Sequence, residues 1–591
     1  MKNWILLRKS ADYAGLSKEL NIDPVAVRIM VNRGLTDLED MKRFLSSDIS
    51  ESFSYKGLPN IEKAVEKIKE AKEKNLKTLI VGDYDADGVC ASVILMKGLK
   101  LFGLDCDYVI PNRIFDGYGI NENIVKKAHS DGVGFIITCD NGISAKDSID
   151  LAVDLGMEVV VTDHHTVTES EVPTKTDAIV NPKLSGSEYP FEDICGAQVA
   201  FKVLSALFDT DTKFDTIKEE LLEFAAIACV TDVMPLINEN RNLVKWALIR
   251  LKSALNPGLN KLVEKCELSG KERLVATDIG FRIGPCINAS GRIEVADVSV
   301  NLFLSDDEGK REELSDKLLS LNAERKDLTE KCVNDGIGRI KEMYAEGGLP
   351  DVIVLYLPEC HVSICGLVAG RIRESFYHPA LVFTDSNDGL TGSGRSIDEY
   401  NMIEGIQKCA DILDKFGGHK AACGLSLKKE KLPELIERLN SDSNLTKEDL
   451  TEKLFIDADM PFGYVTESLI DDLFKLEPFG TKNPAPVFAL KDLQLIKGRR
   501  IGENHIFLTV KDSKGNIKEL KLWRKADEFE EFLLREKGEG IIEKLYDYRG
   551  VSLLGENLLL TVSYYPGINV YKDRRNIDFT VKDYKFYRFG V

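Results

Sequence analysis

Short apolar runs rich in β-branched residues alternate with helix-forming stretches from about Leu58 to Leu255. This alternation is typical of a parallel, doubly wound α/β sheet. Each run is four to eight residues long, as expected for a buried strand. The expected strands are LKTLIVGD (76–83), DCDYVIPN (105–112), GFIITCD (134–140), EVVVTD (158–163) and DAIVNP (177–182).

The pattern changes three times along the rest of the chain. Apolar residues recur at helical spacing within 296–345, which predicts a long connecting helix or helix pair. Apolar strands and helices then return, and short alternating strands after residue 477 predict a small β-barrel. The expected barrel strands are LQLIKGRRI (493–501), HIFLTVKD (505–512), IKELKLWR (517–524), LYDYRGVSLL (545–554) and NLLLTVSYYP (557–566). The expected divisions are a helical segment at 1–55, an α/β domain at 56–295, the connecting helix at 296–345, a second α/β domain at 346–450, and the barrel with its linker at 451–591.

Several of the predicted strands end in polar groups. The first is followed by Asp83, Asp85 and Asp87, and the second by Asn112 and Arg113. Open α/β sheets place their ligands at the carboxyl ends of the strands. Three carboxylates within five residues repel one another unless a cation lies between them, and oxygen donors suit Mg²⁺ or Mn²⁺.

Two further strand ends complete this pattern. Asp140 follows GFIITC, and the pair His164 and His165 follows EVVVTD. Asp232 ends a later apolar helix. Each residue alone has an ordinary explanation, because a lone Asp after a strand is usually a helix cap and a lone His is usually a hydrogen-bonding residue. Together they predict a two-cation site of Asp85, Asp87, Asp140, His164 and Asp232, with His165 free to contact a phosphate or move a proton.

Composition restricts the protein class. The chain has 591 residues, of which 43% are hydrophobic and 30% charged, as in globular proteins with several cores. The net charge of −19 argues against a general nucleic-acid coat protein but not against an enzyme with arginines in one cleft. The 12 cysteines form no C-x-x-C pair and predict buried, reduced thiols. No apolar run is long enough for a membrane span, so we expect a cytoplasmic protein.

Strand aromatics in the predicted barrel leave two possibilities open. Phe507, Trp523, Tyr546 and Tyr548 could form a surface for stacking bases, or they could be part of the barrel core, which is the commoner place for such residues.

The motifs GDYDADG, TCDNGI and TDHH, with the later Asp232, resemble in order the four acidic motifs of the DHH phosphoesterase superfamily. Within it, the chain resembles the RecJ family of bacterial single-strand DNA exonucleases through PNRIFDGYG (111–119), ICGAQVAFK (194–202), GFRIGPCINASGR (280–292), GSGRSI (392–397), FGGHKAACG (416–424) and LEPFGTKNPAPVF (476–488). The resemblance implies a DHH domain, a long connecting helix, a DHH-associated domain and a C-terminal OB-fold.

The resemblance also implies a function. It is hydrolysis of single-stranded DNA from the 5′ end with Mn²⁺ or Mg²⁺, which releases mononucleotides during recombination and repair. The metal ligands implied are Asp85, Asp87, Asp140, His164 and Asp232, with Asp83 in support. The substrate contacts implied are Arg113, Ser393 and Arg395 on the 5′ phosphate, Tyr118 on a terminal base, and Asn288, Arg292 and His419 on neighbouring phosphates. The partner set is single-stranded DNA, with a single-strand-binding protein and a RecQ-type helicase as candidate protein partners of a monomer.

One departure and two alternatives accompany this interpretation. Cys286 stands where the family usually has an arginine, so one phosphate contact is expected to be weaker. The first alternative is a DHH phosphodiesterase for short oligonucleotides or cyclic dinucleotides, which needs no barrel. The second is a non-catalytic replication scaffold, which is disfavoured because every acid is present.

Overall fold

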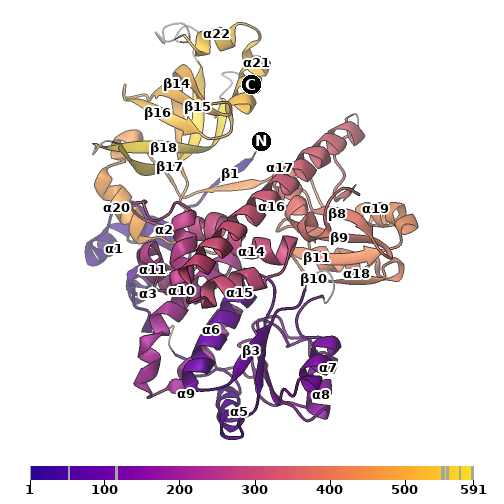
Figure 1. The fold of residues 1–591 in the computed structure, drawn as a ribbon. Coiled ribbons are helices and arrows are strands. Elements are labelled where there is room, and N and C mark those ends of the chain that lie inside the picture. Colours follow the sequence, from indigo (N-terminus) through magenta and orange to yellow (C-terminus); the bar gives the residue numbers. More distant parts are fainter. Residues whose placement is uncertain are drawn as a thin grey trace. The chain divides into compact units, whose positions relative to one another are not determined.

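The computed structural model describes residues 2–50, 54–112, 117–345, 347–547, 553, 558–571 and 574–586. The chain divides into two compact units (Figure 1). One consists of residues 47–450 with 480–482, and the other combines residues 1–46 with 451–479 and 483–591. The candidate site lies entirely in the first unit.

The first sheet of this unit is parallel throughout, with the strand order β3-β2-β4-β5-β6. All the strands predicted for it are present, and the predicted α/β class is confirmed. Alternate strand residues point to opposite faces, so that Ile137 packs towards α5, α6 and α9, whereas Ile136 packs towards α7 and α8 (Figure 1). The bounds are β2 (Thr78–Val81), β3 (Cys106–Val109), β4 (Phe135–Cys139), β5 (Glu158–Thr162), β6 (Ile179–Val180), α5 (Ile61–Glu73), α6 (Ala86–Phe102), α7 (Glu122–Ser130), α8 (Lys146–Asp154) and α9 (Gly196–Phe208).

A group of helices follows the sheet in the chain and extends its core. Residues 296–345, predicted to be a helix or helix pair, contain α15 and the long α16. The bounds are α10 (Lys218–Thr231), α11 (Asn238–Arg250), α12 (Pro257–Lys265), α13 (Ala276–Asp278), α14 (Gly284–Ile293), α15 (Asp297–Leu304) and α16 (Glu308–Met343).

A second sheet follows α16, with the strand order β10-β11-β9-β8-β7. Helix α17 packs on one face through Val382 and Val368, whereas α18 and α19 cover the other face around Leu381. The bounds are β7 (Ile353–Tyr356), α17 (Cys365–Phe376), β8 (Ala380–Ser386), β9 (Gly389–Arg395), α18 (Met402–Gln407), β10 (Lys415–His419), β11 (Ala422–Leu427) and α19 (Leu432–Ser441).

The second unit contains the predicted barrel. Its strands close in the order β14-β15-β16-β18-β17, because β17 also pairs with β14. One predicted strand, 545–554, is wrong at its start, since Leu545 ends a helix; most of its remainder lies outside the described residues. The bounds are β12 (Lys453–Ile456), β13 (Ala458–Asp459), α20 (Glu467–Lys475), β14 (Phe488–Ile501), β15 (His505–Lys511), β16 (Ile517–Leu522), α21 (Ala526–Lys537), α22 (Ile541–Leu545), β17 (Leu559–Tyr571) and β18 (Arg574–Phe586).

The barrel aromatics do not share one environment. Phe507 alternates with buried Ile506 and Leu508, and its ring meets the edge of Trp523, which is 45% exposed. This pair is therefore not part of the barrel core. Tyr546 donates a hydrogen bond to Glu530 on α21, and Tyr548 lies outside the described residues.

The N-terminal residues belong to the barrel unit. Strand β1 (Asn3–Leu6) pairs in parallel with β12, and α1 (Tyr13–Leu20), α2 (Pro24–Asn32) and α3 (Leu38–Leu45) follow it. All twelve cysteines are buried free thiols, as predicted. In the part of the chain that the structure describes, no helix has the length and apolar character needed to cross a membrane.

Candidate functional site

The predicted ligands meet at the carboxyl edge of the first sheet. Asp83, Asp87, Asp140 and His164 are all at most 4% exposed. They come from the segments that directly follow β2, β4 and β5, where Asp87 lies in the first turn of α6, so the parallel topology brings distant parts of the chain together. The side chains form three groups whose potential ligand atoms lie within 4.8 Å of one another: Asp83–Asp85–Asp140, Asp87–His164–Asp232 and Asp140–His164–His165.

His164 lies among the carboxylates of this cluster. Its Nε2 is 3.1 Å from Asp140 Oδ1 and 3.6 Å from both Asp87 Oδ2 and Asp232 Oδ2. Burial, followed by the charge of His165, lowers the pKa of His164 to about 3. His164 is therefore a neutral imidazole, which is the form that binds a metal ion.

Two local features hold the acids in place. Asp85 is the N-cap of α6, and its Oδ1 accepts hydrogen bonds from the amides of Asp87 and Gly88 at 2.9 and 3.1 Å. One oxygen of this residue is thus used for capping and the other is available to a cation. Asp140 adopts a left-handed backbone, with φ of 61°, which is uncommon for a residue other than glycine.

The electrostatics of the cluster favour a cation. Burial, followed by the charge of Asp85, raises the pKa of Asp87 to about 7. Burial and neighbouring carboxylates also hold the pKa values of Asp140 and Asp232 well above the usual range. Among the described residues, the buried Asp140 Oδ1 and His164 Nε2 make no hydrogen bond. A set of oxygen donors with one imidazole fits Mn²⁺ or Mg²⁺, which would relieve this repulsion.

His165 differs from its neighbour in charge and exposure. Its side chain is 45% exposed, and Nδ1 lies 2.7 Å from Asp163 Oδ1. Burial acts to lower the pKa of His165, but the hydrogen bond with Asp163 and the charges of Asp163, Asp232 and Asp85 together outweigh it and raise the pKa to about 9. Asp163 also accepts hydrogen bonds from the amides of His164, His165 and Ile143. The Asp163 carboxylate therefore orients the His165 ring.

Tyr118 lies at the edge of the cluster. Its hydroxyl donates a hydrogen bond of 2.8 Å to the carbonyl of Asp140, and its ring meets the edges of His165 and Tyr84. The side chain is 51% exposed, so a face of the ring is open to a ligand. Arg113, the other predicted residue of this loop, lies outside the described residues.

The second sheet supplies residues from the face on which α17 packs. Ser393 and Arg395 lie on the same side of β9, and Arg395 Nη1 donates to Ser393 Oγ at 3.0 Å. His419 on β10 lines a cavity of about 820 Å³ together with Tyr118 and His165. Burial and the positive charges of Arg395 and His165 lower the pKa of His419. His419 is therefore close enough to both His165 and Arg395 to feel their charges.

Two side chains predicted to contact phosphates form hydrogen bonds with the backbone. Asn288 Oδ1 accepts from the Ala86 amide at the start of α6 at 2.8 Å. Arg292 Nη1 donates to the carbonyl of Ser363, which precedes α17, at 2.8 Å. Cys286 is buried and hydrogen-bonds Asn322 of α16, so this position takes part in helix packing.

Tyr118 also lines a second cavity. This cavity has a volume of about 660 Å³, and its lining includes Tyr84, Ser363, Gly366 and Ser393. Tyr118 therefore borders two cavities. The sequence reasoning did not single out Tyr84 or Gly366.

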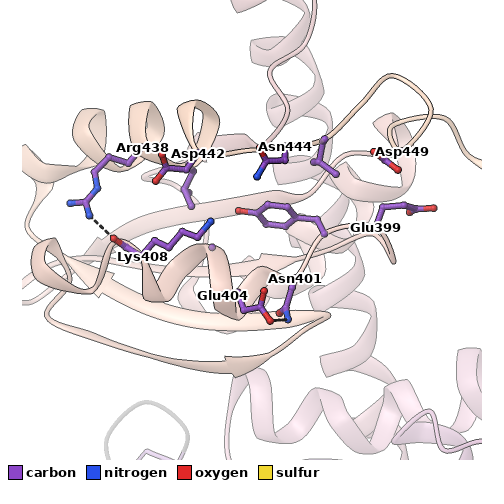
Figure 2. A pocket seen from close by; sticks show the side chains of 12 residues that line it. Glu399, Asn401, Glu404, Lys408, Arg438, Asp442, Asn444 and Asp449 are labelled. Atoms are coloured by element: carbon purple, nitrogen blue, oxygen red, sulfur yellow. Dashed lines mark hydrogen bonds between the residues drawn. The ribbon is translucent and has the colours of Figure 1, made fainter.

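A smaller hollow of about 290 Å³ lies elsewhere in the second α/β domain (Figure 2). Tyr400 is among its lining residues, Arg438 donates a hydrogen bond to the Lys408 carbonyl, and Asn401 donates one to Glu404. None of the three groups of potential metal ligands found among the described residues lies there. The cluster around His164 is therefore the candidate site.

Comparisons with known proteins match three segments of the chain. The models for the DHH family N-terminal domain, the DHHA1 domain and the RecJ OB domain match residues 77–229, 350–442 and 456–583. These matches confirm the predicted DHH, DHH-associated and OB-fold assignments.

Curated relatives match most of the chain. The single-stranded-DNA-specific exonuclease RecJ of Bacillus subtilis is 35% identical over 527 residues, which cover 87% of this chain and 65% of that protein. The Escherichia coli protein of the same name is 31% identical over 536 residues, covering 86% of this chain and 90% of its own. The crystal structure of Thermus thermophilus RecJ in complex with Mn²⁺ matches with a TM-score of 0.80 and 25% identity, covering 99% of this chain and 80% of that one.

Proposed function

Because this chain belongs to the RecJ family of single-stranded-DNA-specific exonucleases, we propose that it hydrolyses single-stranded DNA from the 5′ end and releases mononucleotides. The observation that carries this proposal is the buried cluster of carboxylates around His164, whose neighbour His165 lines one cavity together with the exposed His419 of the second sheet. A metal cluster in one domain and phosphate contacts in the other suit a strand that lies between them.

The proposed metal ligands are Asp85, Asp87, Asp140, His164 and Asp232, with Asp83 in support. The Thermus thermophilus relative was crystallised with Mn²⁺, and the donor set here suits Mn²⁺ or Mg²⁺. The chemistry that two such ions supply is activation of water and neutralisation of charge on the leaving oxygen.

His165 is the proposed proton donor or phosphate contact. Asp163 fixes its ring through Nδ1, whereas Nε2 lies 3.3 Å from the Tyr118 hydroxyl and is the ring nitrogen proposed to meet the substrate. The raised pKa keeps this imidazole protonated at neutral pH, so it carries a positive charge beside the phosphate. A protonated imidazole at hydrogen-bond distance can also protonate a leaving oxygen.

The direction of digestion follows from the proposed 5′-phosphate pocket. Ser393 and Arg395 lie on β9, and Arg113 is proposed to join them. Tyr118 then stacks on the terminal base, while Asn288, Arg292 and His419 contact neighbouring phosphates. A guanidinium group is suited to a terminal phosphate because its donors match the phosphate oxygens in geometry.

The barrel is proposed to bind single-stranded DNA through an aromatic surface. Phe507 and Trp523 form an aromatic pair on its outer surface, and Arg499 and Lys521 lie over the Phe507 ring. Aromatic rings with adjacent cations stack bases and attract phosphates. The alternative, a phosphodiesterase for short oligonucleotides or cyclic dinucleotides, gives no role to this surface.

Replacing one acid tests the metal site. Asp140→Ala should abolish cleavage of 5′-phosphorylated single strands in Mn²⁺ while folding and strand binding persist. The control is Asp131→Ala, an exposed acid at the end of α7, which should cleave like the wild type. Unchanged turnover in Asp140→Ala would contradict the metal assignment.

The same assay tests substrate and direction. Strands labelled at either end should release the 5′ label first, as mononucleotides, and a 5′-blocked strand should resist digestion. Cleavage of dinucleotides alone, with long strands untouched, would support the alternative function instead.

We also propose, on family membership alone, a cytoplasmic role in DNA recombination and repair with a single-strand-binding protein and a RecQ-type helicase as partners. Co-purification of either protein with the intact chain tests this, and a failure of both to bind would contradict it.

A further inference from the structure

The start of helix α9 holds one of the proposed metal ligands. The amides of Gly196 and Ala197 donate hydrogen bonds of 2.7 Å to Asp87 Oδ2 and Oδ1 respectively. Both oxygens of this carboxylate are therefore fixed by the first two residues of one helix. The positive end of the helix dipole adds to the attraction for the carboxylate.

The same helix start also touches a second ligand. A Cβ atom on Gly196 would lie 2.6 Å from Asp140 Cβ and 2.7 Å from Asp140 Oδ1. Only glycine leaves enough space here, because real Cβ atoms do not approach other atoms so closely. A shift of α9 would consequently move Asp87 and press on Asp140 at once.

An amide pair anchors this helix start. Gln198 Oε1 accepts from the Cys195 amide at 3.1 Å, and Gln198 Nε2 donates to Asn240 Oδ1 at 2.9 Å. Asn240 Nδ2 in turn donates to the carbonyls of Asp193 and Pro235. The Gln198 and Asn240 side chains are at most 3% exposed, so water does not compete for these bonds.

The Gln198–Asn240 pair links the segment before α9 to the loop after Asp232, and these two segments position different proposed metal ligands. Asp193 precedes α9, whose amides hold Asp87, and Pro235 follows Asp232 by three residues. We propose that Gln198 and Asn240 are positioning residues for the metal centre, because their hydrogen bonds align the α9 amides with Asp87 and fix the loop that follows Asp232. This inference rests on the proposed function, since it takes Asp87 and Asp232 as metal ligands.

The test is the affinity for Mn²⁺ in the absence of DNA. Gln198→Met keeps the size of the side chain but removes both of its hydrogen bonds. We expect isothermal titration calorimetry to show Mn²⁺ binding about tenfold weaker than in the wild type, as is usual when a residue behind a metal ligand is replaced. At saturating Mn²⁺, kcat should return close to the wild-type value, because Gln198 does not touch the substrate.

A neighbouring ion pair provides the matched control. Lys202 Nζ lies 2.8 Å from Glu239 Oε2, so this buried pair joins α9 to α11 one turn further along. The double variant Lys202→Met with Glu239→Gln removes its charge without reaching the helix start. It should leave Mn²⁺ affinity unchanged even where thermal stability falls.

The outcomes separate this inference from the proposed function. Wild-type affinity in Gln198→Met, or an equal loss in the control, would overturn the positioning role. Failure of the wild type itself to bind Mn²⁺ would contradict the proposed function instead. Should Gln198→Met not fold, Asn240→Ser removes the other half of the pair and carries the same expectation.

Discussion

At the scale of single residues, Glu223 shows how burial alters the pKa of a carboxyl group outside the candidate site. This α10 side chain is fully buried, and its Oε2 accepts from the Leu255 amide at 2.9 Å. Burial raises the pKa of Glu223 to about 7. Because the folded-state pKa exceeds that of the unfolded chain, Glu223 costs stability as the pH rises from its ordinary value of 4.5 through about 7.

Glu223→Gln should therefore stabilise the protein in one pH range. Above pH 8 the variant avoids a buried charge, and the gain should be of the order of 2 kcal/mol. Near pH 4.5 most of the gain should vanish, because the folded-state acid is neutral and only about half of the unfolded-state acid is ionised. Thermal melts at the two pH values measure the difference. An equal effect at both would show that hydrogen bonding, not charge, controls this position.

Sequence reasoning identified the site residues whose chemistry is carried by the side chain itself. Asp85, Asp140 and His164 stood out because they follow apolar strands that had to end at one sheet edge. The amides of Gly196 and Ala197 did not stand out, because a backbone donor has no residue type of its own. The ICGAQ motif was visible, but its contact with Asp87 depends on how α9 packs, which periodicity does not specify.

At the scale of elements, helix α17 is positioned by a glycine beside the proposed 5′-phosphate pocket. A Cβ atom on Gly366 would lie 2.7 Å from Arg395 Nη2 and 3.0 Å from Ser393 Oγ. The helix start therefore packs directly on the β9 pair. Any side chain at this position would displace the guanidinium or the helix.

Gly366→Ala should reduce the preference for 5′-phosphorylated over 5′-hydroxyl strands. We expect a loss of about tenfold, since a misplaced charged hydrogen bond costs about 1.5 kcal/mol or more. Digestion rates of the two strand types give the ratio. The control is Gly370→Ala one turn later, whose Cβ would approach Arg395 no closer than 4.0 Å. A preserved ratio in Gly366→Ala would contradict the location of the pocket.

Helices and strands could be predicted where a single hydrophobic periodicity dominated the segment. The buried strands of the first sheet are continuous apolar runs, so their existence followed from sequence. The segment 545–554 was wrongly predicted to begin as a strand, because a short apolar run fits a strand or a helix equally well. Leu545 instead ends α22 and packs into the barrel core from that helix. The pairing of β1 with β12 joins residues 450 positions apart and left no local signal.

At the scale of the whole molecule, the N-terminal residues complete the barrel unit. Ile29, Met30 and Val31 on α2 are fully buried in the same core as the barrel strands. Asn32 Nδ2 donates to the Asp457 carbonyl at 3.2 Å. The sequence predicted a helical segment here, but it could not show which core the segment joins.

Met30→Ala should therefore loosen the barrel unit and spare the unit that contains the site. Loss of a buried methionine side chain costs about 2–5 kcal/mol through lost burial and the cavity left behind. Hydrogen exchange measured by mass spectrometry should become faster in β14 and β17 and stay unchanged in β4. Lys18→Ala, an exposed change on α1, is the control and should alter neither. Equal acceleration in β4 would mean that the two units unfold together, and the N-terminal residues would then support the metal site as well.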